Sequence, residues 1–311
     1  MKDGPTRAVA VYAPGSVSNL GPGFDCLGIA FTGRGDLVTA ARAGGRGVRV
    51  AAISDSRIPL EAERNTAAIA AAAVLRRAGD AAGALELTIE KGLPLSAGLG
   101  GSAASAVAGA VAADALLGTH LSRADLLAAA LEGEAAVSGR HPDNVAPSLL
   151  GGAVLVVSLD PVHVTPLRVH PDLGLVLATP GYAVETAQAR AVLPAQVSRA
   201  EAVGQAARLG GLVVGLERGD AELIRRAMVD AIAEPARAAL YPGYAEARAA
   251  ALEAGAVGVA VSGAGPSLVA VVRAAEAERV CAALRTAYGR RGIGAEVTAA
   301  EVDGRGARVV S

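Results

Sequence analysis

Aromatic, cysteine and lysine residues are scarce in this chain, and each shortage excludes a class of protein. The 311 residues include no tryptophan, two phenylalanines, five tyrosines and two cysteines. Neither an aromatic stacking surface for nucleic acid nor a disulfide scaffold is therefore expected. Lys2 and Lys91 are the only lysines, and neither follows glycines in the frame of a Walker phosphate loop. The formal net charge of −1 provides no basic field, so we expect no nucleic-acid partner.

Uninterrupted apolar runs are missing too. Two uncharged stretches, 92–113 and 254–272, are long enough to span a bilayer, but glycine, serine and proline interrupt both. A buried loop with its helix, and a buried pair of strands, explain these stretches better. The first residues resemble a strand and carry no apolar signal segment. These patterns predict a cytoplasmic protein that does not enter a membrane.

The most informative segment that is present is Pro94–Ala104, here called the glycine loop. It follows a strand-like run at 85–89 and leads into an Ala/Val helix that ends near Leu117. Glycines allow a backbone to approach a ligand closely. At the start of a helix, N–H groups and the helix dipole favour a phosphate. The segment therefore predicts a phosphate site, although glycines also serve close helix packing.

Strand and helix patterns are mixed without regular alternation, which favours the α+β class over a doubly wound sheet. Strands are expected at 8–13, 27–31, 37–41, 48–53, 85–89, 152–159, 173–178, 257–272 (two strands) and 295–302. Helices are expected at 66–77, from the glycine loop to 117, at 122–137, at several places between 184 and 254, and at 276–288. Loops are expected at 14–23 and 141–147, and a hinge between two lobes at 160–171.

Two of these loops carry side chains that suit a small polar ligand. Asn19 and Asp25 belong to the first, where Asp25 could pair with an ammonium group. Asn, Gly, Pro and Asp also form ordinary turns, so the alternative is a structural turn. His141, Asp143 and Asn144 belong to the second loop, which could equally be a capping turn. The residues alone leave both alternatives open.

Glu134 shares one helical face with Leu127 and Leu131. A carboxylate on an apolar face is costly unless a cation meets it. Mg²⁺ bridging nucleotide phosphates would suit, because it binds one or two carboxylates together with phosphate oxygens. A salt bridge to a nearby arginine is one alternative, and a drift of the apolar face toward the end of the helix is another. Helical periodicity does not separate these possibilities.

Two further features involve arginine and glycine. Arg190 lies one helical turn after Thr186, and together with Arg237 it could grip a carboxylate. Single arginines on helices are usually solvated, which is the alternative for each. A second glycine turn, Ser262–Ser267, lies between two apolar strands. It could support the glycine loop or simply close a hairpin.

Taken together, these segments resemble the GHMP small-molecule kinases. The segments Ala13–Gly28, His141–Pro147, Thr186–Pro194 and Ile232–Arg237 resemble the homoserine kinases within that superfamily. The resemblance runs from about residue 8 to 310 and keeps the family's order. It implies an N-terminal lobe like domain 2 of ribosomal protein S5, over 1–160, that carries the ATP loop. A ferredoxin-like C-terminal lobe over 161–311 would complete the substrate site.

The resemblance also implies an activity, namely ATP- and Mg²⁺-dependent phosphorylation of the side-chain hydroxyl of L-homoserine. The product would be O-phospho-L-homoserine, which is used in threonine synthesis. ATP and L-homoserine would be the small-molecule partners, and a homodimer is common among relatives. Two alternatives stay open. One is another kinase of the superfamily, acting on mevalonate, shikimate or a related acid, and the other is a ligand-binding relative without catalysis.

The resemblance assigns roles to individual residues. ATP would be bound by Asn65, near the adenosine, and by Pro94, Leu95, Ser96, Ala97, Gly98, Leu99, Gly100, Gly101, Ser102, Ala103 and Ala104. Homoserine would be bound by Asn19, Asp25, His141, Asn144, Thr186, Arg190 and Arg237. Asn144 would orient the reacting hydroxyl, and Ser102 and Glu134 would lie near Mg²⁺. Asp143 is the candidate base, ranked below direct transfer without a dedicated base.

The chain departs from the family pattern at two places. Gly101 stands where many relatives have serine, which leaves the hydroxyl contact to Ser102. The spacing from Glu134 to His141 is a residue shorter than in some relatives. That difference makes Glu132 the alternative metal ligand.

Overall fold

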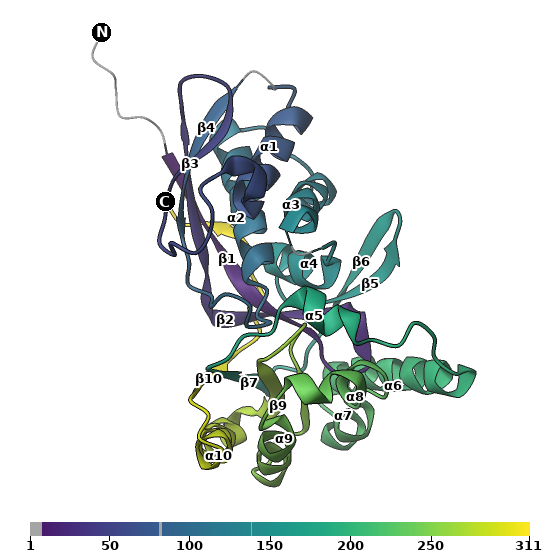
Figure 1. Cartoon of the computed structure of the whole chain (residues 1–311). Helices are drawn as coiled ribbons and strands as arrows, with labels where there is room; N and C mark the ends of the chain where they lie inside the picture. Colours follow the sequence, from purple (N-terminus) through teal and green to yellow (C-terminus); the bar gives the residue numbers. More distant parts are fainter. Residues whose placement is uncertain (1–7, 81–82, 138) are drawn as a thin grey trace.

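The computed structural model describes residues 8–80, 83–137 and 139–311. Within these ranges the chain forms two lobes, each built on one β-sheet with helices packed against it (Figure 1). The mixture of helices and sheets confirms the expected α+β class. In the part of the chain that the structure describes, no helix is both long and apolar enough to cross a membrane.

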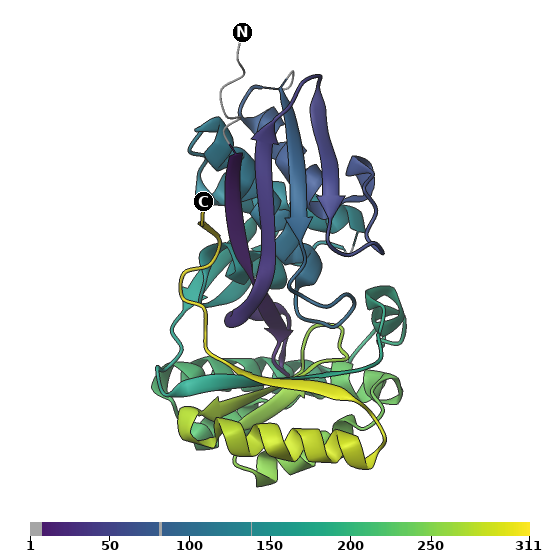
Figure 2. The ribbon, with the colours of Figure 1, turned by 90° about the vertical axis from the view of Figure 1, so that its left-hand side faces the viewer.

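The N-terminal lobe contains a seven-stranded sheet with the order β11-β1-β2-β4-β3, which β5 and β6 extend from β2. Only β3 and β4 run parallel among its described pairs. The last strand brings the end of the chain back beside β1 (Figure 2). The strands are β1 (Ala8–Asn19), β2 (Gly23–Arg42), β3 (Gly47–Ile53), β4 (Ala84–Glu90), β5 (Ala153–Leu159), β6 (Val162–Leu167) and β11 (Arg308–Val309).

Four helices cover one face of this sheet (Figure 1). They are α1 (Thr66–Arg77), α2 (Gly101–Leu117), α3 (Arg123–Val137) and α4 (Pro142–Leu150), and a 3-10 turn at Ala62–Arg64 precedes α1. Small residues let these helices approach closely, and a Cβ on Gly109 would lie 2.8 Å from the Cα of Ala67. Because α2 is apolar on nearly every side, it is buried along most of its length.

The C-terminal lobe contains a four-stranded antiparallel sheet with the order β10-β7-β9-β8. This is the order of a ferredoxin-like lobe, with α10 joining β9 to β10. Figures 1 and 2 show α9 and α10 on the face of the sheet that points away from the N-terminal lobe. The strands are β7 (Leu173–Pro180), β8 (Gly258–Val261), β9 (Leu268–Arg273) and β10 (Ala295–Ala300).

Most helices of this lobe lie between β7 and β8 in the sequence. They are α5 (Thr186–Ala191), α6 (Arg199–Arg218), α7 (Ala221–Ala227), α8 (Ala233–Arg237), a 3-10 turn (Ala238–Leu240) and α9 (Tyr244–Glu253). A 3-10 turn at Ala274–Glu276 precedes α10 (Ala277–Arg290). Ser198 and Glu201 form a capping box at the start of α6, which satisfies two backbone donors there.

The expected loop at 14–23 is wrong for most of its length. β1 continues to Asn19, and the two strands expected at 27–31 and 37–41 are parts of the single strand β2. The register between β1 and β2 shifts between Pro14 and Ser16. Proline and glycine, which usually indicate turns, here accompany a bulge in a continuous strand pair.

Two further local predictions are wrong. The expected loop at 141–147 forms most of α4, because Pro142 lies in the first turn, where a helix tolerates proline. The expected hinge at 160–171 contains β6, which pairs with β5. The expected lobe boundary after residue 160 falls inside this hairpin, so we propose that the N-terminal lobe extends to Leu167 and also takes in β11.

Candidate active site

A cavity of about 300 Å³ is lined by residues of both lobes. The N-terminal lobe contributes the β1–β2 turn, residues 57–59 and 64–66, the glycine loop and the start of α4. The C-terminal lobe contributes α5, Arg237 and residues 263–265. The predicted site residues that line it are Asn19, Asp25, Asn65, Pro94, Leu95, Ser96, Ala97, Gly98, Leu99, Gly100, Gly101, Ser102, Glu134, His141, Asp143, Asn144, Thr186, Arg190 and Arg237. Ala103 and Ala104 do not line it, because they are completely buried in the core.

The glycine loop forms one wall of the cavity and depends on left-handed backbone conformations. Gly98 and Gly100 have φ values of +75° and +68°, which residues with a side chain rarely adopt. The backbone N–H of Ser16 donates to the Leu99 carbonyl at 3.2 Å and ties the loop to β1. Since α2 begins at Gly101, the N–H groups of its first turn lie at the end of the loop. First-turn N–H groups have no carbonyl partner within a helix and suit an anion.

The second glycine turn supports the glycine loop from the other lobe. The Ser262 hydroxyl donates to the Gly98 carbonyl at 2.6 Å, and the backbone N–H of Ser267 donates to the Ala97 carbonyl at 3.2 Å. The same turn connects β8 to β9. Both roles considered from the sequence are therefore present in one segment.

Glu134 lies on α3 beneath the glycine loop and is 3% exposed. One carboxylate oxygen accepts a hydrogen bond from the Ser102 hydroxyl at 2.9 Å. The other, Oε2, has no hydrogen-bond partner among the described residues. Burial raises the pKa of Glu134 to about 8, and the Asp143 carboxylate adds to the rise. A buried carboxylate with an unpartnered oxygen fits a bound cation.

Glu132 has a different environment from Glu134. Its two oxygens accept from Arg76 and Arg77 at 2.5 and 2.6 Å, and its side chain is 41% exposed. It does not line the cavity. Of the two glutamates considered as metal ligands, only Glu134 faces the glycine loop.

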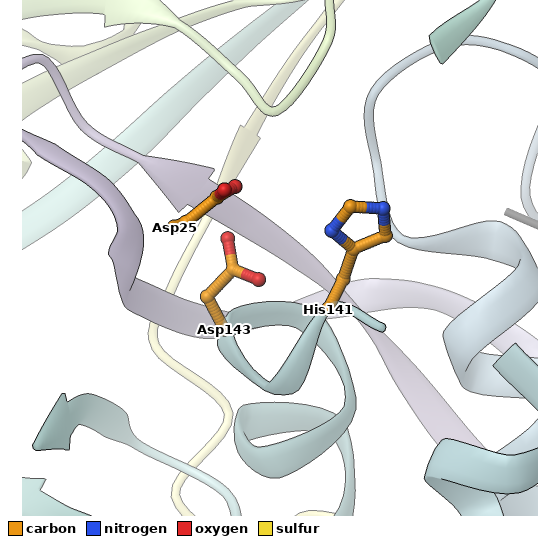
Figure 3. A group of neighbouring side chains, drawn as sticks. All are labelled: Asp25, His141 and Asp143. Atoms are coloured by element: carbon orange, nitrogen blue, oxygen red, sulfur yellow. The ribbon is translucent and has the colours of Figure 1, made fainter. Parts of the chain in front are cut away.

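Three of the predicted residues that line the cavity face one another (Figure 3). Asp25, His141 and Asp143 offer ligand atoms that all lie within 4.8 Å of one another, a spacing that a metal ion could use. Arg190 already donates to both oxygens of Asp25, at 2.8 and 3.1 Å, and lies 3.2 Å from Nδ1 of His141. A guanidinium at this place repels a metal cation, so the group suits a charged organic substrate better.

Asp143 is the most buried member of this group, with 1% exposure. Its Oδ1 atom has no hydrogen-bond partner in the described part of the chain. Burial raises the pKa of Asp143 to about 7, with a further contribution from the Asp25 carboxylate, while a hydrogen bond from Ser18 opposes the rise. Near neutral pH the group can therefore hold or release a proton.

Two asparagines are fixed by hydrogen bonds to their surroundings. Asn144 accepts from the Ser16 hydroxyl at 3.1 Å and donates to the Ser18 hydroxyl at 3.0 Å. Asn19 donates to the Gly263 carbonyl at 2.8 Å and accepts from the backbone N–H of Asp25 at 3.0 Å. These bonds fix both amides at the wall of the cavity.

Arg237 and Asn65 are also held by the backbone. Arg237 is 4% exposed and donates to the carbonyls of Ala189 and Gly263 at 2.8 and 3.3 Å. Asn65 caps α1, because its side-chain oxygen accepts from the N–H groups of Ala67 and Ala68. Thr186, the first residue of α5, lies at the cavity wall.

Phe24 and Lys91 are among the residues that line the cavity but were not assigned to the site from the sequence. Phe24 lies beneath both arginines, with its ring centre 5.7 Å from the guanidinium carbon of Arg190 and 5.1 Å from that of Arg237. Lys91 lies three residues before the glycine loop, and its side chain is almost completely buried. The sequence offers little to mark these two residues as part of a site, since one aromatic residue in a turn and one lysine after a strand are both common.

Comparisons with known proteins agree with this geometry. The family described as "GHMP kinases N terminal domain" matches residues 65–152, and "GHMP kinases C terminal" matches residues 212–290. A homoserine kinase of Xanthomonas campestris pv. campestris is 43% identical over 232 residues, which cover 74% of this chain and 71% of that protein. A homoserine kinase of Chloroherpeton thalassium is 36% identical, over 74% of this chain and 76% of that protein.

Solved structures give the same result. The crystal structure of homoserine kinase from Cytophaga hutchinsonii matches with a TM-score of 0.94 and 40% identity, covering 100% of this chain and 99% of that one. A mevalonate kinase of L. major matches with a TM-score of 0.69 at 16% identity, covering 94% of this chain and 96% of that one, and so shares the fold. The chain therefore belongs to the GHMP kinases and, within them, to the homoserine kinase family.

Proposed function

We propose that this chain is an ATP-dependent homoserine kinase, which transfers the γ-phosphoryl group of ATP to the side-chain hydroxyl of L-homoserine. The observation that carries the proposal is the content of one cavity. It holds a glycine loop of the phosphate-binding type together with an acid and two arginines. A nucleotide needs the glycine loop for its phosphates, and an amino acid needs the acid and the arginines for its two charged groups.

The amino acid would be held by charge and by the fixed amides. Asp25 would bind the ammonium group, and Arg190 and Arg237 would bind the carboxylate, as charge-assisted hydrogen bonds favour. Asn19, His141 and Thr186 would complete this end of the site. Asn144, which Ser16 and Ser18 fix between them, would orient the hydroxyl toward the phosphate.

ATP would be held by the glycine loop and the start of α2. Asn65 and the neighbouring Arg57, Ile58, Pro59 and Arg64 line the same cavity and would surround the nucleoside. The connection from Ser262 to Gly98 fixes the loop before the nucleotide binds. Because the loop is already ordered, less of the binding free energy is lost to ordering it when the nucleotide binds.

The residues present fit Mg²⁺, because Glu134 has a buried oxygen without a partner and Ser102 lies beside it. These two residues would hold the ion. When bound, Mg²⁺ neutralises charge on the transferring phosphates.

The chain's own contribution to phosphoryl transfer is mainly positioning. The substrate oxygen bonds to the γ-phosphorus as the bond to the β–γ bridging oxygen breaks, and ADP leaves. The hydroxyl proton is lost to the transferred phosphoryl group or to solvent, so no strong base is required. Asp143, with its pKa near 7, is the alternative acceptor in this chain.

A coupled assay of ADP release tests the function. L-Homoserine should give turnover well above the ATPase background, whereas mevalonate and shikimate, which lack an ammonium group, should not. Turnover with mevalonate or shikimate alone would assign the chain to another branch, and no turnover with any substrate would indicate a non-catalytic relative. We also propose a homodimer, which light scattering would detect as twice the 30.6 kDa mass of the chain.

A further inference from the structure

Both ends of the glycine loop are attached to one buried ion pair, formed by Asp36 of β2 and Lys91. Asp36 is completely buried, and the Lys91 side chain is 4% exposed. Just before the loop, the Asp36 Oδ1 atom accepts from the backbone N–H groups of Gly92 and Leu93, at 3.1 and 3.4 Å.

At the other end of the loop, the same pair reaches the first turns of α2. Asp36 Oδ2 accepts from the Ser105 hydroxyl at 2.6 Å. Lys91 Nζ donates to the Gly101 carbonyl at 2.8 Å and to the Ser105 hydroxyl at 2.9 Å. We call Asp36, Lys91 and Ser105 the loop brace.

The bonds of Lys91 decide what it can do. An ammonium group has three N–H donors, and Asp36, Gly101 and Ser105 provide three acceptors. Although Lys91 lines the cavity, its donors are therefore used inside the protein. This differs from a Walker lysine, whose ammonium group contacts the phosphates directly.

We infer that Lys91 is a positioning residue, which acts with Asp36 to hold the glycine loop in the shape that binds the ATP phosphates. The inference rests on the proposed function for the identity of the nucleotide. Since Gly101 has no side chain, residue 101 presents only its carbonyl to the ammonium group of Lys91.

Asp36→Asn separates this role from direct phosphate binding. If Lys91 gripped a phosphate, loss of the Asp36 charge would release the lysine and leave nucleotide binding unchanged or tighter. If the brace acts as a unit, Asp36→Asn and Lys91→Met should each weaken binding of N-methylanthraniloyl-ADP by roughly tenfold. The double variant D36N/K91M should then be no weaker than either single variant, because coupled residues are not additive.

The double variant is also expected to fold, because it removes both charges of the pair and leaves no unpaired charge buried. Its amide hydrogen exchange should accelerate across residues 94–105 in the absence of nucleotide. The matched control is D303N/R308M, which removes another largely buried ion pair (3.1 Å) whose members do not line the cavity. That control should leave nucleotide affinity and exchange of the loop unchanged.

Three results would overturn the inference: tight nucleotide binding in D36N, unchanged loop exchange in D36N/K91M, or an equal loss of affinity in the control. Nucleotide binding is measured without homoserine, so a failed homoserine assay does not bear on this outcome. In the active enzyme, the brace variants should raise KM for ATP while KM for homoserine stays within about twofold.

Discussion

Asp25 and Arg190, from different lobes, form a bidentate ion pair at the substrate end of the cavity, with N–O distances of 2.8 and 3.1 Å. The two side chains are 37% and 39% exposed, so a ligand can reach both. An amino acid carries one charge for each partner. Its ammonium and carboxylate can therefore take over these contacts together, which neither charge alone can do.

This pair predicts selectivity for a zwitterion. 4-Hydroxybutyrate lacks the ammonium group and 3-amino-1-propanol lacks the carboxylate. Each should have a kcat/KM lower than that of L-homoserine by roughly 10- to 150-fold, the value of one charge-assisted hydrogen bond. Asp25→Asn should remove most of the preference for homoserine over 4-hydroxybutyrate. Steady-state kinetics with the three substrates check this, and equal kcat/KM values for the wild type would contradict it.

Glu134 and Glu132 form a matched pair for testing the metal site. Glu134→Gln should weaken the apparent affinity for Mg²⁺ by at least about tenfold, because it removes the buried carboxyl group that would bind the ion beside Ser102. Glu132→Gln only breaks contacts to Arg76 and Arg77 at the surface and should change that affinity by less than about twofold. Initial rates against free Mg²⁺ at saturating ATP measure both. A larger effect from Glu132→Gln would reverse the assignment.

Replacement of two adjacent glycines by alanine should change the stability of the protein in opposite directions. Gly100 has a φ of +68°, and an added Cβ would collide with the Ser16 hydroxyl. Gly100→Ala should therefore lower the free energy of unfolding by roughly 1–2 kcal/mol and raise KM for ATP. At Gly101 the nearest atom to an added Cβ is 3.5 Å away, so Gly101→Ala should stabilise by about 0.4–1 kcal/mol. Chemical denaturation of both variants checks the prediction, and similar destabilisation would refute it.

Glu234 predicts a component of the pH dependence of stability. Its carboxyl group accepts from the Val261 N–H and the Tyr244 hydroxyl, both at 2.9 Å, and burial raises its pKa to about 7. The native state keeps this proton to higher pH than the unfolded chain. Its contribution to stability is thus complete below about pH 4.5 and is lost as pH rises toward 7, by at most about 3 kcal/mol.

Glu234→Gln removes this titration, so the variant should lose less stability than the wild type between pH 5 and 7. The pKa values of Asp143 and Glu134 are also raised, so both groups contribute to the loss of stability with rising pH in the wild type and in the variant. The difference between the two denaturation curves is therefore the measured quantity. Parallel curves would show that Glu234 does not titrate in this range.

The α+β class and most strands and helices could be predicted from the sequence, because hydrophobic periodicity is local. Proline caused the main error. Pro142 and Pro147 suggested a loop where the chain forms α4, since a proline in a first helical turn is tolerated and Pro147 is accommodated within the helix. Likewise, β6 was missed because proline and histidine in this segment, such as Pro166 and His163, suggested a hinge. Pairing with β5, which is not visible in the local sequence, stabilises the strand.

The site residues that belong to short sequence motifs could be predicted. The glycine loop, Asp25 and Arg190 were chosen from such motifs, and the fold brings them to one cavity. Contacts between residues far apart in the sequence could not be predicted. Asp36 and Lys91 lie 55 positions apart, and only the pairing of β2 with β4 brings them together.

Phosphoryl transfer to homoserine is the central claim, and phosphorus NMR of the reaction mixture tests it most directly. Purified protein with ATP, Mg²⁺ and L-homoserine should produce a new phosphomonoester resonance and an equal amount of ADP. Formation of inorganic phosphate in place of the ester, or consumption of ATP that does not depend on homoserine, would contradict the account.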